Sequence, residues 1–196
     1  TAVTSSSANE QSGLFKTVVR TKVGSPFVIA GMEEAKRQGG RIVVGFEANG
    51  GVLLGSDVAM AGGTLTALPT RDSMLPMLSV LGLGLRESKT VSELVAALPA
   101  RFAASGRLEH VGPERTGPFL GKLQDEAFRA AFFVGKGNIL TVDQIDGIRF
   151  VFDSGDTVHY RASGNAPELR CYAETSNSHR SADLLAWGLE AAASAL

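Results

Sequence analysis

One loop near the C-terminal end of the chain combines residue types that bind phosphate. Arg161, Ser163, Gly164 and Asn165 lie between two stretches that are predicted as strands. A guanidinium offers a planar fork of donors that suits phosphate, and a serine hydroxyl adds another donor. Small residues let backbone N–H groups approach an anion closely, as in a nest. The pattern predicts an anion-binding loop; the alternative is a plain hairpin loop whose arginine forms a surface salt bridge.

A second loop holds residue types that bind sugar hydroxyls. Glu47 and Asn49 place a carboxylate and an amide two positions apart, just before Gly50 and Gly51. Such a pair can form hydrogen bonds with adjacent hydroxyl groups of a sugar. Asn-Gly is also the strongest short-range hairpin signal, because it accepts a positive φ. The alternative is therefore that Asn49 and Gly50 only make a turn and that Glu47 is solvated.

A third candidate lies at a predicted junction between a strand and a helix, and consists of Lys22, Gly24 and Ser25. The N-terminus of a helix favours anions, and Lys22 would add positive charge there. The alternative is ordinary N-capping by Ser25, with Pro26 at the first helical position.

The other reactive side chains do not form a recognisable site. His110, His159 and His179 lack the spacing of metal ligands, and His159 is predicted to lie on one face of a strand. Cys171 has no activating base nearby in the sequence. As the single cysteine it excludes an internal disulfide and suggests a reducing compartment. Asp146-Gly147 is predicted as a simple turn.

The charge balance excludes two classes of partner. The 196 residues include 19 Lys and Arg against 20 Asp and Glu, a net charge of -1. Nucleic-acid binders usually show a basic excess or stripe, and no basic run favours a membrane surface. We find no signal peptide and no apolar run of roughly 18 residues, so we expect a cytoplasmic protein. Since residue 1 is Thr, we expect the chain to begin inside a longer protein.

The pattern of apolar residues and of turn signals predicts two domains. Residues 1–105 are predicted as an α/β domain with a mixed sheet, with strands and helices at Thr17–Val23, Ser25–Gln38, Arg41–Phe46, Gly51–Leu54, Pro69–Leu81 and Thr90–Leu98. Residues 106–118, rich in Gly and Pro, are predicted as a linker.

Residues 119–196 are predicted as a small α+β domain. We expect a helix at 121–133, strands at Ile139–Val142, Ile148–Phe152, Thr157–Arg161 and Glu168–Glu174, and a final helix at Ser178–Ala193. Leu185, Leu189 and Ala193 recur every four residues and are predicted as the buried face of that helix.

Four segments, taken in order, resemble one enzyme family. They are TKVGSPFV at 21–28, GFEANGGVLL at 45–54, DGIRFVF at 146–152 and RASGNAPELRCYAE at 161–174. The series is similar to the α-D-phosphohexomutases, which include bacterial phosphomannomutase and phosphoglucomutase. The similarity covers the third and fourth of that family's four domains. It implies that the second domain has a four-stranded antiparallel sheet with helices, in the manner of the TATA-binding protein.

The resemblance also implies a reaction. Such enzymes interconvert hexose 1-phosphates and hexose 6-phosphates of mannose or glucose. A phosphoserine assisted by Mg²⁺ donates its phosphoryl group, a bisphosphorylated hexose forms and reorients, and the other phosphate returns to the serine. The partner implied is therefore a phosphosugar substrate.

At the level of single residues, the resemblance implies three sets of substrate contacts in this chain. It implies a sugar-binding loop at Glu47, Asn49 and Gly51, a substrate loop at Lys22, Gly24 and Ser25, and a phosphate-binding loop at Arg161, Ser163, Gly164 and Asn165. Three positions depart from the family pattern. Gly51 and Ser25 stand where relatives often have His, and Ala166 stands where they have Glu.

Neither the family's serine loop nor its metal loop has a counterpart in this sequence. We therefore expect the catalytic serine and the Mg²⁺ ligands in missing N-terminal domains of the same polypeptide, and an inactive chain without them. The alternative is a stand-alone, non-catalytic module that binds phosphosugars or other proteins.

Overall fold

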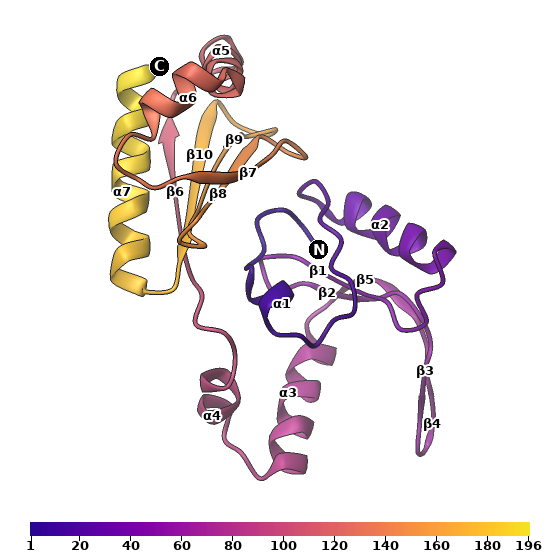
Figure 1. Cartoon of the computed structure of the whole chain (residues 1–196). Coiled ribbons are helices and arrows are strands. Elements are labelled where there is room, and N and C mark those ends of the chain that lie inside the picture. Colours follow the sequence, from indigo (N-terminus) through magenta and orange to yellow (C-terminus); the bar gives the residue numbers. More distant parts are fainter. The chain divides into compact units, whose positions relative to one another are not determined.

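The computed structural model describes residues 1–196 and divides them into two compact units, Thr1–Pro99 and Ala100–Leu196 (Figure 1). None of the helices combines the length and the apolar character needed to cross a membrane.

Unit 1 is built on short strands. Its elements are α1 Ala8–Gln11, α2 Ser25–Arg37, β1 Val44–Phe46, β2 Val52–Leu54, β3 Val58–Met60, β4 Gly63–Leu65, β5 Leu68–Asp72, α3 Met74–Glu87 and α4 Val91–Ala96. The strands β1, β2 and β5 form an antiparallel sheet in the order β1-β2-β5, and β3 pairs with β4 as a separate hairpin. The predicted hairpin between Phe46 and Val52 is confirmed.

Helix α2 packs against this sheet through an apolar face. Val28 and Met32 are buried together with Val43 and Leu53. The approach is close because Gly45 has no side chain: a Cβ there would overlap Met32 and Val28. The packing places the first turn of α2 beside the end of β1, where two of the predicted loops lie.

Two predictions for unit 1 are wrong. Thr17–Val23 forms no regular strand, since its only bridge joins Thr21 to Ala2. Pro69 does not open a helix but lies in β5, and α3 begins five residues later at Met74. The carboxylate of Asp72 accepts hydrogen bonds from the Met74 and Leu75 amides (2.8 and 3.3 Å), which starts the helix there. Pro76 then falls in the first turn, where its missing N–H is not needed.

Unit 2 is a sheet of five antiparallel strands with helices. Its elements are β6 Phe102–Glu109, α5 Pro113–Gln124, α6 Glu126–Phe132, β7 Ile139–Asp143, β8 Ile148–Phe152, β9 Thr157–Ala162, β10 Glu168–Thr175 and α7 Ser178–Ala195. The strand order is β6-β10-β9-β8-β7. The predicted α+β class and all four predicted strands are confirmed, with β6 as a fifth strand.

The core of unit 2 lies between the sheet and its helices. Phe150, Phe152 and Tyr160 project from β8 and β9 into a cluster that also holds Phe119 and Phe133. The alternation along the strands turns the neighbouring residues to the opposite face, as expected for a period of two. The site residues of β9 are carried on that opposite face.

The predicted linker at 106–118 is wrong, because these residues form the end of β6 and the first half of α5. Gly106 packs under α7, where a Cβ would come within 2.8 Å of Leu189. Gly112 and Pro113 are the N-cap and first residue of α5. Glycine and proline were interpreted as signs of a loop. Here Gly106 allows a close contact with α7, and Pro113 starts a helix.

The final helix α7 is confirmed, but its predicted buried face is only partly correct. Leu185 and Leu189 pack against the core, whereas Ala193 is exposed and Ala192 is buried instead. An α-helix turns by about 100° per residue, so a strict spacing of four drifts away from one face. Gly188 brings α7 close to the sheet, where the Tyr160 hydroxyl donates to the Gly188 carbonyl (2.7 Å).

Candidate functional site

Glu47 is the centre of a polar cluster in unit 1. It follows β1, and its side chain is 4% exposed. Its Oε2 accepts hydrogen bonds from the Ser25 hydroxyl (3.0 Å) and from Arg71 Nε (2.7 Å). Arg71 Nε also lies 2.9 Å from Ser25 Oγ. We call Ser25, Glu47 and Arg71 the carboxylate cluster. Glu47 Oε1 forms no hydrogen bond and remains an acceptor.

The turn after Glu47 is the hairpin that its Asn-Gly sequence predicts. Gly50 has a φ of 88°, and its N–H donates to the Glu47 carbonyl (3.0 Å). The side-chain oxygen of Asn49 accepts from the Gly51 amide (3.0 Å). The side-chain nitrogen of Asn49 has no partner in the chain, so the residue makes the turn and still offers a donor.

Arg71 is the functional candidate that the sequence analysis missed. It lies on β5, and its stem covers Gly51: a Cβ at Gly51 would lie 3.1 Å from Arg71 Cγ and 3.2 Å from Cδ. The arginine side chain is 55% exposed, and its two terminal nitrogens have no partner in the chain. Residues 69–81 were predicted as a helix, so no sequence signal placed this guanidinium beside Glu47.

The substrate loop has a geometry that differs from the predicted one. Ser25 does not cap α2: it is the first helical residue, and Gly24 precedes it with φ 127° and ψ 140°. That backbone conformation requires glycine, and it leaves the Ser25 hydroxyl free to contact Glu47 and Arg71. Lys22 lies over the ring of Phe27 at 5.9 Å from its centroid and makes no contact with the carboxylate cluster.

Arg161 is held by the turn between β7 and β8. Its Nε donates to the Asp146 carboxylate (2.7 Å), and its side chain is 14% exposed. The pairing resembles the predicted alternative, except that the arginine is largely buried. Gly147 has a φ of 79°, and a Cβ there would overlap the Tyr160 carbonyl. The turn therefore packs directly on the backbone of β9.

The rest of the phosphate loop connects β9 to β10. The Ser163 amide donates to the Glu168 carbonyl (2.9 Å), and Ser163 Oγ accepts from the Asn165 amide (3.4 Å). The Ser163 hydroxyl proton is not used by these bonds. Gly164 has no atom within 4 Å of a Cβ position, and no residue of the loop has a positive φ. The expected nest is not formed, so side chains and exposed amides are the donors this loop presents.

His159 lies beside Arg161 and was not predicted as part of the site. It is 2% exposed, and its Nε2 lies 2.6 Å from the Asp146 carbonyl oxygen. Burial is the main cause that lowers its pKa from 6.5 to about 4, and Arg149 and Arg161 add to it. Its Nδ1 is buried without a partner.

Cys171 is a core residue. It is fully buried, and burial raises the pKa of its thiol to about 12. No group of three or more His, Cys, Asp or Glu side chains in the chain is arranged to hold a metal ion.

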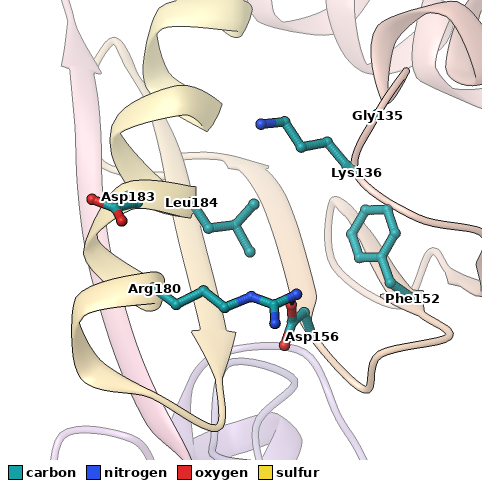
Figure 2. A pocket seen from close by; sticks show the side chains of 7 residues that line it. All are labelled: Gly135, Lys136, Phe152, Asp156, Arg180, Asp183 and Leu184. Carbon is teal, nitrogen blue, oxygen red and sulfur yellow. Dashed lines mark ion pairs between the residues drawn. The ribbon is translucent and has the colours of Figure 1, made fainter.

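One pocket of unit 2 contains none of the predicted site residues. It has a volume of ≈ 190 Å³ and is lined by residues such as Lys136, Phe152, Asp156, Arg180 and Asp183 (Figure 2). Arg180 forms an ion pair with Asp156, and Lys136 lies over the Trp187 ring. Its charges balance each other, so it has no preference for an anion.

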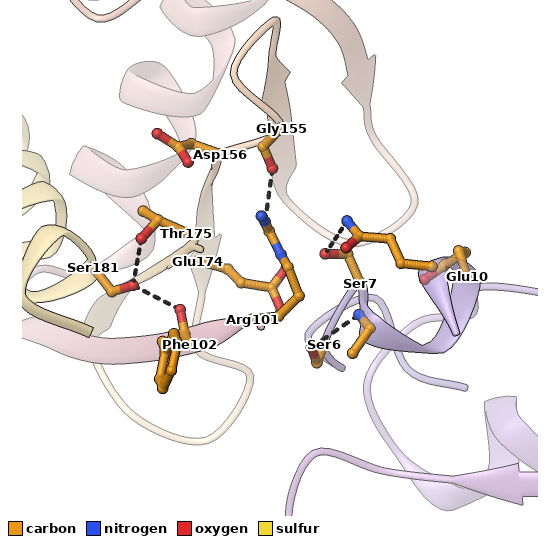
Figure 3. A network of polar contacts seen from close by, with 12 residues as sticks. Ser6, Ser7, Glu10, Arg101, Phe102, Gly155, Asp156, Glu174, Thr175 and Ser181 are labelled. Atoms are coloured by element: carbon orange, nitrogen blue, oxygen red, sulfur yellow. Dashed lines mark hydrogen bonds and ion pairs between the residues drawn. The ribbon is translucent and has the colours of Figure 1, made fainter. Parts of the chain in front are cut away.

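A buried polar network supports the start of β6 (Figure 3). Arg101 donates to the Gly155 carbonyl (2.7 Å) and pairs with Glu174 (3.4 Å). The Ser181 hydroxyl contacts the Phe102 carbonyl (2.7 Å). These bonds tie β6 to the β8–β9 turn, to β10 and to α7, which is a structural role.

Comparison with known proteins identifies both units. Residues 1–102 match the family model described as phosphoglucomutase/phosphomannomutase, alpha/beta/alpha domain III, and residues 86–187 match that of the C-terminal domain. The chain belongs to the phosphoglucomutase/phosphomannomutase family. The predicted resemblance to its third and fourth domains is thereby confirmed.

Two curated relatives agree with this assignment. The chain is 42% identical over 190 residues to a phosphomannomutase of Sinorhizobium fredii, covering 96% of this chain and 40% of that protein. It is 41% identical over 185 residues to a phosphomannomutase of Salmonella muenchen, covering 93% and 38%. The chain thus spans about two-fifths of these relatives. A phosphoglucomutase/phosphomannomutase family protein from Burkholderia thailandensis has the same fold, with a TM-score of 0.60 at 18% identity over 90% of this chain and 32% of that one.

Proposed function

We propose that the chain is the substrate-binding part of a phosphohexomutase that interconverts hexose 1-phosphates and hexose 6-phosphates of mannose or glucose. The observation that carries the proposal is that each matched family domain holds a polar cluster with unused hydrogen-bonding groups. One cluster suits sugar hydroxyls and the other suits a phosphate group.

The carboxylate cluster supplies the sugar contacts in this proposal. Glu47 Oε2 is occupied by Ser25 and Arg71, so Oε1 accepts a bond from a sugar hydroxyl. The amide nitrogen of Asn49 donates to a neighbouring hydroxyl. Arg71 extends over Gly51 and adds donors at a position where Gly51 has no side chain. Gly24 and Lys22 border the same end of α2.

The phosphate loop holds the phosphate group that is not being transferred. Asp146 uses Arg161 Nε, which leaves the two terminal nitrogens of Arg161 for a paired contact with phosphate oxygens. The Ser163 hydroxyl and the exposed backbone at Gly164 and Asn165 add donors. A charge-assisted pair of this kind gives orientation as well as affinity.

The reacting groups come from outside these residues in this proposal. A phosphoserine and its Mg²⁺ ligands belong to N-terminal domains of the same polypeptide, and the transferred phosphoryl passes through a bisphosphorylated hexose. The 196 residues contain no group of three or more His, Cys, Asp or Glu side chains that could hold a metal ion. What this chain contributes is the binding and orientation of the sugar and its distal phosphate.

The test is Glu47→Gln in the full-length polypeptide, with Glu34→Gln on the outer face of α2 as the matched control. Removing the charge should raise KM about tenfold for both the 1-phosphate and the 6-phosphate, because a charge-assisted hydrogen bond contributes about 1.5–3 kcal/mol. The control should leave both constants within about twofold. A loss confined to one of the two substrates would contradict a shared sugar contact.

A second candidate function is a stand-alone module that binds phosphosugars without catalysis. The observation behind it is that the polar clusters around Glu47 and Arg161 both lie within this chain and keep unused hydrogen-bonding groups. Both functions predict that the chain binds mannose 6-phosphate. They differ in turnover: the module predicts no mutase activity for any polypeptide that contains the chain.

A further inference from the structure

Asp146 is contacted by two residues of the same strand. The Asp146 carbonyl oxygen lies 2.6 Å from His159 Nε2, and the Asp146 carboxylate lies 2.7 Å from Arg161 Nε. His159 and Arg161 are two positions apart on β9, so both project from the same face of the sheet. His159 therefore contacts the backbone of Asp146, while the carboxylate of Asp146 binds the guanidinium of Arg161.

The imidazole of His159 has a defined protonation state. A carbonyl oxygen can only accept a hydrogen bond, so Nε2 carries the proton. Burial keeps the ring neutral by lowering its pKa to about 4, so Nδ1 carries none. The ring is also stacked on Tyr172, with centroids 5.4 Å apart and planes at 26°. His159 is thus a fixed donor aimed at the Asp146 backbone.

This arrangement leaves one polar atom unsatisfied. His159 Nδ1 is buried and has no hydrogen-bond partner. An apolar side chain at 159 would avoid that cost in a buried position. A histidine with an unsatisfied Nδ1 is explained if its Nε2–H donor has a function that an apolar side chain cannot provide.

That function concerns the orientation of the Arg161 side chain. An arginine side chain has several rotatable bonds, and ordering them when a ligand binds weakens the affinity. With Nε bound to Asp146, the fork of terminal nitrogens is already oriented before a ligand arrives. Gly147 lets the turn lie directly against β9, which fixes the distance between Asp146 and the strand.

We propose that His159 and Asp146 are positioning residues that orient the Arg161 guanidinium for the phosphate group of a phosphosugar. The identity of the ligand rests on the proposed function. The orientation of Arg161 does not, because it concerns contacts within unit 2.

The experiment uses the 196-residue chain and follows the Arg161 Nε–H signal by ¹⁵N NMR, assigned by its loss in Arg161→Ala. Three variants are compared. His159→Leu removes the donor, His159→Gln keeps an N–H donor on a side chain of similar reach, and Asp146→Asn removes the charged acceptor. Affinity for mannose 6-phosphate is measured on the same samples by calorimetry.

We expect a slowly exchanging Nε–H signal in the wild-type chain and in His159→Gln. The signal is lost in His159→Leu and in Asp146→Asn, and the dissociation constant for mannose 6-phosphate rises about tenfold in both. In His159→Gln the dissociation constant rises less than about threefold. Rescue by Gln separates positioning from simple packing, since Leu fills the buried site as well as Gln does.

An unchanged Nε–H signal and unchanged affinity in His159→Leu would overturn the role of His159, and the same result in Asp146→Asn would overturn that of Asp146. Asp146→Asn keeps the backbone carbonyl, so it tests the orientation of Arg161 even if His159→Leu unfolds. If the wild-type chain does not bind mannose 6-phosphate but the pattern of Nε–H signals holds, the proposed function fails and the positioning role stands.

Discussion

The two polar clusters of this chain are supported in different ways. Arg161 and its neighbours lie on a sheet of five strands that is backed by an aromatic core, and the Arg161 side chain is 14% exposed. Glu47 follows a strand of three residues, Arg71 lies on a strand of five residues, and the Arg71 side chain is 55% exposed. We therefore infer that Arg161 is oriented in advance, whereas the exposed Arg71 of the carboxylate cluster can adjust around the buried Glu47.

This difference fits the two ligand groups that we assign. A phosphate group has the same geometry in every hexose phosphate, so a fixed receptor suits it. A sugar ring presents different hydroxyls in its two orientations, and an exposed arginine beside a turn can follow them. The predictions below test the contrast between a rigid and an adaptable cluster.

The largest effect is expected for Gly147→Ala in unit 2. Gly147 has a positive φ, and a Cβ would overlap the Tyr160 carbonyl, so we expect the free energy of unfolding to fall by about 4 kcal/mol. Gly164→Ala is the control: it has open space and no positive φ, and should change stability by less than about 0.5 kcal/mol. Urea denaturation measures both. Equal effects of the two substitutions would show that the turn is not fixed against β9.

The next effect concerns pH and His159. The pKa of the folded state is lowered from 6.5 to about 4, so the unfolded chain takes up the proton first as the pH falls. The free energy of unfolding should therefore decrease between pH 6.5 and pH 4, by up to ~3 kcal/mol from this residue. The loss should shrink in His159→Leu and persist in His179→Leu, which alters an exposed helix residue. Denaturation at pH 7 and pH 4.5 provides the comparison, and identical acid losses in wild type and His159→Leu would refute it.

Arg161→Ala should weaken the binding of mannose 6-phosphate by roughly ten- to a hundredfold, because two charge-assisted hydrogen bonds are lost. The fold should persist. Arg170→Ala is the matched control. Arg170 lies opposite Arg161 in the register of β9 and β10, but its side chain forms an ion pair with Glu168 and not with Asp146. Equal losses for the two arginines would indicate attraction by general charge rather than a specific site.

The smallest effect is expected for Arg71→Ala in unit 1. Its ion pair is exposed on the arginine side, so stability should change by less than about 1 kcal/mol. We expect the dissociation constant for hexose phosphates to rise about threefold to tenfold, with a larger change in discrimination between mannose and glucose phosphates than Arg161→Ala causes. Lys36→Ala on α2 serves as the control. If Arg71→Ala left the affinity for hexose phosphates and the discrimination between mannose and glucose phosphates unchanged, a role of Arg71 in sugar binding would be contradicted.

The strands of unit 2 were predictable because their pattern is local. Thr157–Arg161 alternates between polar and apolar residues, and Ile148–Phe152 is rich in β-branched and aromatic residues. β6 was missed because Gly106 and the small residues around it weaken the same signal. In unit 1, Pro69 suggested the start of a helix, but Leu68–Asp72 forms a strand because it pairs with β2. Tertiary contacts of this kind leave no trace in a window of neighbouring residues.

The candidate site shows the same limit. The loops at 47–51 and 161–165 were found because their residues adjoin in sequence, and their binding roles stay predictions. Arg71 lies 24 residues from Glu47, and Asp146 lies 15 from Arg161. Each of these contacts is created by strand pairing and by a close turn, so no spacing rule could reveal it. Both partners nevertheless determine how the predicted residue presents its donors or acceptors.

The packing of Gly188 against the sheet has a practical consequence for studying this protein. The absent side chain lets α7 cover the Cys171 sulfur, to which a Cβ at Gly188 would come within 3.0 Å. Cys171 is the only cysteine, fully buried, with a pKa raised to about 12. A thiol reagent therefore reacts only when α7 separates from β10, and the labelling rate measures the opening of unit 2 with no engineered probe.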